Sequence, residues 1–121
     1  MNSHHRQLHL RQAAGYVELG ELLADGDAPV PCHSRTLFHR ALAELRQLPQ
    51  PTREAPTSSL LEGRALRALG EFADAVVPLR RAAEAAPQEL EAWLGLGWCS
   101  KRLGRLDEAI DALRQIGRAH V

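Results

Sequence analysis

An internal repeat with a period of 34 residues dominates the sequence of this 121-residue chain. Residues 56–87 match residues 90–121, and identical residues recur at Leu60, Gly63, Leu69, Gly70, Ala75, Leu79, Arg80 and Ala85 and 34 positions later. Two further pairs, Phe72 with Leu106 and Val76 with Ile110, are apolar in both units. A period of about 20 to 50 residues is typical of stacked repeats, in which each unit contacts only its neighbours. The sequence therefore predicts a stack of similar units.

Each unit has the pattern of two helices joined by a tight turn. Leu69-Gly70 and Leu103-Gly104 place a glycine where the end of a first helix needs a left-handed residue, and an apolar period of about 3.6 residues resumes directly afterwards. In the last unit, Gly97 and Ala109 lie on the facing sides of the two predicted helices, where small residues allow a close approach. Each unit is predicted to be an antiparallel helical hairpin.

The third unit also carries a recognisable motif. It contains Trp93-Leu94-Gly95-Leu96-Gly97, then Gly104, then Leu106-Asp107-Glu108-Ala109-Ile110. This pattern resembles the tetratricopeptide repeat, a 34-residue helix-turn-helix interaction module, and Pro87 stands where that family ends its second helix. The second unit departs from the family pattern at Ser59, Glu62 and Pro78. The resemblance implies an all-α fold, with antiparallel hairpins stacked as a short right-handed α-solenoid of about six helices.

A degenerate first unit is expected in residues 1–55, followed by repeats at 56–87 and 88–121. Aligning Leu19-Gly20 with Leu69-Gly70 predicts a first helix from about Gln7 to Leu19 and a second from Phe38 to Leu48. The excess chain between them, around residues 21–35, carries turn-forming Gly, Asp and Pro residues and predicts an inserted surface loop. A proline-rich linker is expected at about 49–56.

The end of the chain has an unusual sequence. Residues 115–121, Gln-Ile-Gly-Arg-Ala-His-Val, resemble a sequencing adapter translated in frame, and Gly117 falls where a helix should continue. We expect the natural protein to continue beyond Arg114, with this chain as the N-terminal portion of a longer repeat array whose last repeat here has no capping helix.

Composition and charge exclude several classes of partner. The 15 basic and 15 acidic residues give a formal net charge of zero, without the basic excess typical of proteins that bind nucleic acids or anionic membranes. Charges interrupt every apolar stretch, so no membrane span is expected. Cys32 and Cys99 lack CxxC spacing and the start of the chain lacks a signal sequence, which predicts a cytoplasmic protein.

Metal binding and catalysis find little support in the sequence. His5 and His9 have helical i, i+4 spacing and Cys32-His33 lies in the expected loop, but paired close-spaced ligands on two arms are missing. His33 directly follows Cys32, a poor position for a base that activates a thiol, and Cys99 is expected in the core. We predict no catalytic residue, no metal and no cofactor.

In the family that this chain resembles, the first helices line a concave groove that binds peptides. Trp98 follows Trp93 by five residues, about 140° around a helix, so we expect Trp93 to pack inside and Trp98 to face the groove, unless the neighbouring first helix buries it. Arg64, Arg67, Lys101 and Arg102 would form a basic rim suited to an acidic peptide, or else a solvated face paired with Glu62 or Glu91. The predicted ligand-binding residues are Leu60, Arg64, Arg67, Leu94, Trp98, Lys101 and Arg102.

The family's clamp for C-terminal carboxylates uses Lys and Asn at defined groove positions. Here those positions hold Leu10, Ala14, Leu60, Arg64, Leu94 and Trp98, so this activity is not expected. The predicted function is noncatalytic binding of a partner protein or peptide. Two alternatives remain: an oligomerisation arm that self-associates through its uncapped last repeat, or the regulatory end of a larger enzyme.

Overall fold

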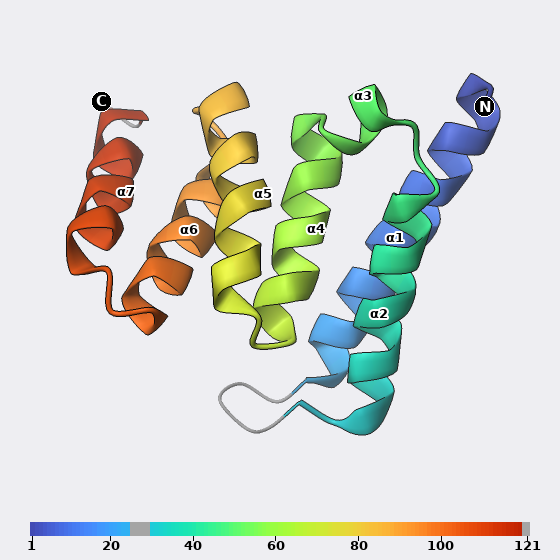
Figure 1. Ribbon diagram of the computed structural model, residues 1–121, viewed down its shortest axis with the longest axis horizontal. Coiled ribbons are helices and arrows are strands. Elements are labelled where there is room, and N and C mark those ends of the chain that lie inside the picture. Colours follow the sequence, from blue (N-terminus) through green and yellow to red (C-terminus); the bar gives the residue numbers. More distant parts are fainter. Residues whose placement is uncertain (25–29, 120–121) are drawn as a thin grey trace.

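The computed structural model describes residues 1–24 and 30–119, and seven helices lie within them. They are α1 (Ser3–Leu23), α2 (Cys32–Arg46), α3 (Gln50–Arg53), α4 (Pro56–Ala68), α5 (Phe72–Ala85), α6 (Leu90–Arg102) and α7 (Leu106–Ala119). The chain forms three antiparallel hairpins, α1 with α2, α4 with α5, and α6 with α7, stacked side by side (Figure 1). The predicted all-α solenoid is confirmed, and the described part holds no strand.

The two clear repeats end their first helices in the same way. Gly70 and Gly104 have φ angles of 82° and 77°, as the glycine pattern predicts. The next amide in each turn donates to a carbonyl five residues earlier: Glu71 N to Leu66 O at 2.9 Å, and Arg105 N to Ser100 O at 2.8 Å. These bonds satisfy carbonyls that the helix end leaves free, so both hairpins turn identically.

The first hairpin has longer helices than the sequence predicts. α1 begins at Ser3 and runs to Leu23 rather than ending at Leu19, and α2 begins at Cys32, directly after Pro31, rather than at Phe38. Helix therefore covers residues 21–23 and 32–35 of the loop predicted at 21–35, and residues 25–29 of that loop lie outside the described residues.

Gly20 explains part of this difference. It lies inside α1 and ends no helix, and a Cβ atom there would come within 2.7 Å of the Phe38 ring. Its small size lets α1 and α2 pack closely, whereas in the other repeats the aligned glycine forms a turn.

The proline-rich linker contains α3, a single-turn helix beyond the six predicted. Arg53 holds it against the end of α2, because its Nη2 donates to the carbonyl oxygens of Arg46 at 2.9 Å and Leu48 at 3.0 Å. Leu48 lies past the end of α2 but is buried. α4 then begins at Pro56, which suits a first helical position because its missing N–H would have no helical partner there.

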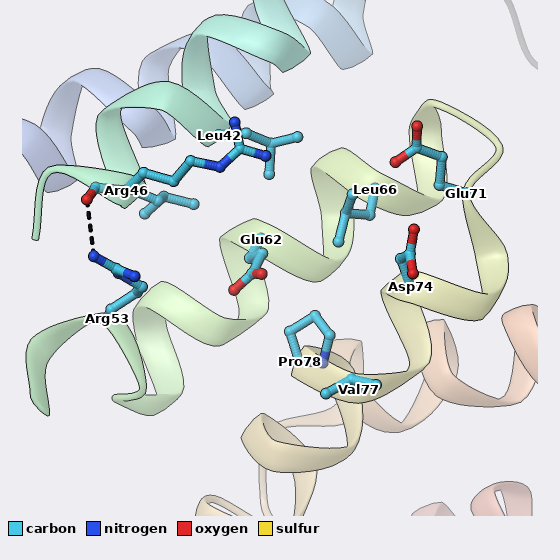
Figure 2. A pocket seen from close by; sticks show the side chains of 10 residues that line it. Leu42, Arg46, Arg53, Glu62, Leu66, Glu71, Asp74, Val77 and Pro78 are labelled. Carbon is cyan, nitrogen blue, oxygen red and sulfur yellow. Dashed lines mark hydrogen bonds between the residues drawn. The ribbon is translucent and has the colours of Figure 1, made fainter. Parts of the chain in front are cut away.

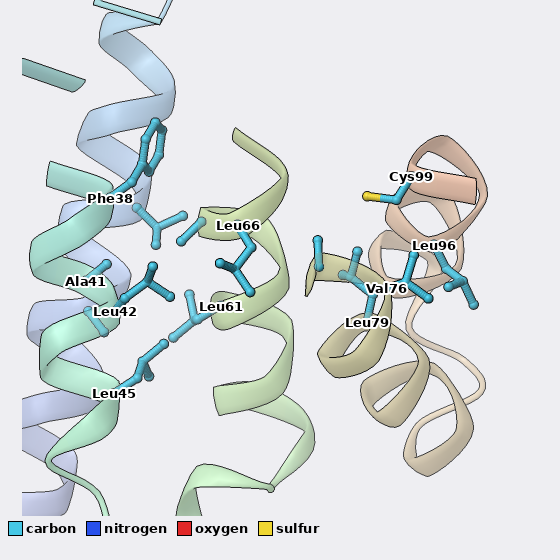
Figure 3. Close-up of a cluster of buried hydrophobic side chains, with 14 of the residues drawn as sticks. Phe38, Ala41, Leu42, Leu45, Leu61, Leu66, Val76, Leu79, Leu96 and Cys99 are labelled. Atoms are coloured by element: carbon cyan, nitrogen blue, oxygen red, sulfur yellow. The ribbon is translucent and has the colours of Figure 1, made fainter. Parts of the chain in front are cut away.

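One apolar core runs through all three hairpins (Figure 3). Near its centre, the buried side chain of Leu79 on α5 lies between two glycines, Gly63 on α4 and Gly95 on α6. A Cβ atom at Gly95 would lie 3.2 Å from the Leu79 methyls, and one at Gly63 would clash with them. α4 and α6 thus each have a glycine, without a side chain, at the position where Leu79 fills the space between the two helices.

Pro78 also lies in α5, one position before Leu79, and it is buried. α5 continues through it from Phe72 to Ala85. Proline has no N–H, so the carbonyl of Asp74 loses its usual helical donor. The proline that departs from the repeat pattern is therefore accommodated inside a helix.

Candidate protein-binding surface

The first helices of the three hairpins lie next to one another, with α4 in contact with both α1 and α6. A pocket of about 230 Å³ lies among them, lined by Glu21, Arg64, Arg67, Leu79, Glu91, Leu94 and Gly95. The structure thus brings together three of the residues predicted to bind a ligand, namely Arg64, Arg67 and Leu94.

Arg64 is engaged in an ion pair between hairpins. Its Nη2 lies 2.5 Å from Oε1 of Glu21 and its Nε lies 3.3 Å from Oε2, so the two groups form a forked contact between α4 and α1. The hydrogen bond to Glu21 raises the pKa of the Arg64 guanidinium above its ordinary value. This contact binds the first hairpin to the second and leaves Arg64 with less capacity to pair with a ligand.

Trp98 lies on the outside of α6, as the sequence predicts. Its side chain is 42% exposed, and the Lys101 Nζ lies 5.6 Å from the centre of its ring. Trp93 is half-buried and packs against the core, and its Nε1 donates to the carbonyl of Pro87 at 2.9 Å. Trp93 therefore packs against the core while Trp98 faces solvent, as their spacing around the helix suggests.

An apolar groove of about 420 Å³ lies between α6 and α7 beside Trp98. It is lined by Leu94, Gly97, Trp98, Lys101, Leu106, Ala109, Ile110 and Leu113. The four residues from α7 are absent from the set predicted by sequence. The sequence does show that these four residues have apolar spacing along one helix face. The same spacing occurs whether that face is buried by a neighbouring helix or exposed to solvent.

Two predicted residues lie outside both hollows. Leu60 is half-buried against the small cluster of Ala82, Ala83 and Ala92. The Arg102 guanidinium lies over the ring of Phe72 on α5, 5.1 Å from its centre. The basic group beside Trp98 is thus Lys101, and Arg67 lies beside Leu94 in the smaller hollow together with the paired Arg64.

Another pocket, of about 390 Å³, lies among α2, α3, α4 and α5 (Figure 2). Its polar lining comes from Arg46, Arg53, Glu62, Glu71 and Asp74, and its apolar lining from Leu42, Leu45, Leu66, Val77 and Pro78. Of this set, sequence reasoning gave a possible functional role only to Glu62, as a charge partner for the basic rim. The proline-rich linker was the available signal, because α3 closes one side of the pocket.

The residues weighed for metal binding or catalysis are dispersed. His9 Nδ1 lies 2.5 Å from Oε2 of Glu44, a contact between α1 and α2. Cys32 is exposed, whereas Cys99 is buried and desolvation raises the pKa of its thiol. In residues 1–24 and 30–119, no group of three His, Cys, Asp or Glu side chains is arranged to hold a metal ion.

None of the described helices combines the length and apolar character needed to cross a bilayer.

Comparisons with known proteins agree with this architecture. A family model described as tetratricopeptide repeat matches residues 60–119, which span the second and third hairpins from α4 to α7. A search of curated proteins found no match.

Proposed function

This chain belongs to the tetratricopeptide-repeat family, whose repeats generally mediate protein–protein interaction, and on that premise we propose that it is a noncatalytic scaffold. The proposed ligand is a segment of a partner protein that lies across α4 and α6. The observation that carries this proposal is the exposed Trp98, which lies beside Leu94 and Lys101 at an apolar groove.

The side chains at this surface indicate the chemistry of the ligand. An apolar side chain would pack on Trp98 and Leu94, and a single carboxylate would pair with Lys101 beside Trp98 or with Arg67 beside Leu94. Glu91 lines the hollow beside Arg67 and Leu94, where its negative charge opposes a run of acidic residues in the ligand. The proposed ligand therefore combines an apolar anchor with one acidic group.

The cytoplasmic setting expected from the sequence belongs to the same proposal. Cys32 and Cys99 are both free thiols, which supports a reducing compartment.

Selection from a displayed library of random peptides tests the proposed function. Peptides that bind the chain should share an apolar residue near an acidic one, and fluorescence polarisation then gives their Kd. We expect Trp98→Ala to weaken binding about 30-fold, which corresponds to the roughly 2 kcal/mol typical of a buried aromatic anchor. Lys101→Glu should weaken acidic peptides selectively.

Val77→Ala is the matched control, because Val77 is exposed on α5 and lines neither hollow beside Trp98. This variant should bind the selected peptides as the natural sequence does. The proposal fails if no peptide is enriched, or if the enriched peptides bind the Trp98→Ala variant equally well.

A further inference from the structure

The apolar face of the second helix is buried in the second repeat, on α5, and exposed in the third repeat, on α7. Val76 and Leu79 on α5 are 2% and 1% exposed, and α6 packs against this helix. Their equivalents on α7, 34 residues later, are Ile110 and Leu113, which are 47% and 55% exposed. In the described part of the chain, no helix occupies on α7 the place that α6 occupies on α5.

The interface between α5 and α6 shows what kind of surface fits there. α6 contributes small residues: Ala92 and Cys99 are fully buried, and Gly95 lies against Leu79. Cys99 points from α6 toward α5 in Figure 3. A helix with small and apolar residues along one face therefore covers this surface in the preceding repeat.

α1 presents such a face to solvent at the other end of the stack. Aligning Leu19-Gly20 with Leu103-Gly104, a shift of 84 residues, puts Leu8, Gly15 and Leu19 at the positions of Ala92, Cys99 and Leu103. Leu8 and Leu19 are nearly half exposed, and a Cβ atom added at Gly15 would meet nothing within 4 Å. Glycine destabilises a helix relative to alanine, and no contact with the described residues requires it there.

The outer faces of α1 and α7 lie at opposite ends of the stack and cannot meet within one molecule (Figure 1). We propose that copies of this chain associate head to tail. The α1 face of one copy, made by Leu8, Gly15 and Leu19, packs on the α7 face of the next, made by Ile110 and Leu113. The second copy then occupies on α7 the place that α6 occupies on α5, so the stack of hairpins continues from one molecule to the next.

Two polar residues set the strength of this contact. Arg11 and Gln12 stand where α6 has Gly95 and Leu96, so α1 cannot approach α7 as closely as α6 approaches α5. We expect weak association, with a Kd on the order of 10 to 100 µM. Because the two contacting faces differ, each added copy leaves a free face, and the mean mass rises with concentration without stopping at a dimer.

Sedimentation velocity on the 121-residue chain, at about 5 to 500 µM, tests the proposal. The unsubstituted chain should show rising mass, whereas Leu113→Glu and Leu19→Glu should each remain monomeric. An equimolar mixture of these two variants should form dimers and nothing larger, because each variant keeps the face that the other lacks.

Val77→Glu is the control for added charge. Val77 is about as exposed as Leu113 and lies at the repeat position of Asp111, so this variant should associate like the natural sequence. Circular dichroism checks the fold of each variant, and Leu8→Glu replaces Leu19→Glu if the latter is not helical.

An unsubstituted 121-residue chain that stays monomeric at the highest concentration overturns the proposal. The proposal is also overturned if Leu113→Glu abolishes association while Leu19→Glu and Leu8→Glu both leave it intact. That result would mean that two α7 faces pair with each other. Peptide binding measured on the monomeric Leu19→Glu variant keeps this result separate from the proposed ligand surface at Trp98, because Leu19 on α1 lines neither hollow beside Leu94.

Discussion

Leu79 and Leu113 stand at the same position in successive repeats, and truncating each to alanine separates the effect of burial from that of residue type. Leu79 is fully buried between α4 and α6, whereas Leu113 is exposed on α7. Replacing a buried leucine with alanine costs about 2 to 5 kcal/mol, depending on how far the cavity collapses. Gly63 and Gly95 flank Leu79 and have no side chains to fill the space, so we expect Leu79→Ala to lower the free energy of unfolding by about 3 to 4 kcal/mol.

The matched substitution Leu113→Ala should change the free energy of unfolding by less than about 0.5 kcal/mol, because Leu113 has little contact to lose in the monomer. Urea unfolding followed by circular dichroism, at about 5 µM protein to keep the chain monomeric, measures both values. In thermal unfolding, the Leu79 variant should lose about 10 to 15 °C in Tm.

A double-mutant cycle tests the same packing argument, because one substitution should change the free energy of unfolding in opposite directions in two backgrounds. Gly63→Ala alone should destabilise by about 1 to 3 kcal/mol, because the new methyl group would clash with Leu79. In a chain that already carries Leu79→Ala, the same change should stabilise by up to about 1 kcal/mol, through the better helix propensity of alanine. Equal losses for the two leucines, or additive effects in the cycle, would refute the packing argument.

Three further predictions concern the turns, the thiols and the ion pair. Gly104→Ala should cost about 1 kcal/mol in the free energy of unfolding, because residue 104 has a φ angle of 77°. Cys32 should react rapidly with a thiol reagent near pH 8 and Cys99 only slowly, because burial raises the pKa of the Cys99 thiol and keeps it protonated; equal rates would contradict this. Glu21→Gln should destabilise by about 1 kcal/mol in low salt and less in high salt, since it removes the charged partner of Arg64; urea unfolding at two salt concentrations measures this.

The fold was predictable where the sequence repeats itself. A period of 34 residues and a glycine at each turn define the two complete hairpins, and Gly70 and Gly104 have the left-handed conformation that the pattern requires. The first hairpin was harder to predict because its helices exceed the repeat unit. There Gly20 follows a leucine as in the other repeats, yet it makes room for Phe38 inside a helix. Sequence alone does not distinguish a glycine that permits a turn from one that permits close packing.

The candidate site was predictable only in part, for a related reason. Helical spacing placed Trp98 away from the core, and the structure agrees. Spacing could not show that Arg64 pairs with Glu21 or that Arg102 lies over Phe72, because these contacts join separate helices. Of the four predicted basic groups, Lys101 therefore lies beside Trp98 and Arg67 beside Leu94, while the other two contact side chains of neighbouring helices. An uncapped last repeat was expected from the sequence, but the exposure of Ile110 and Leu113 was not, since exposure depends on what packs against a helix.

Pro78 has a mechanical consequence for the stack. One hydrogen bond of α5 is missing between residues 74 and 78, so the helix resists bending less there than it would with that bond in place. In a solenoid, a small bend in one helix reorients every repeat that follows it. A bend at this point of α5 would therefore change how the third hairpin is oriented relative to the first two.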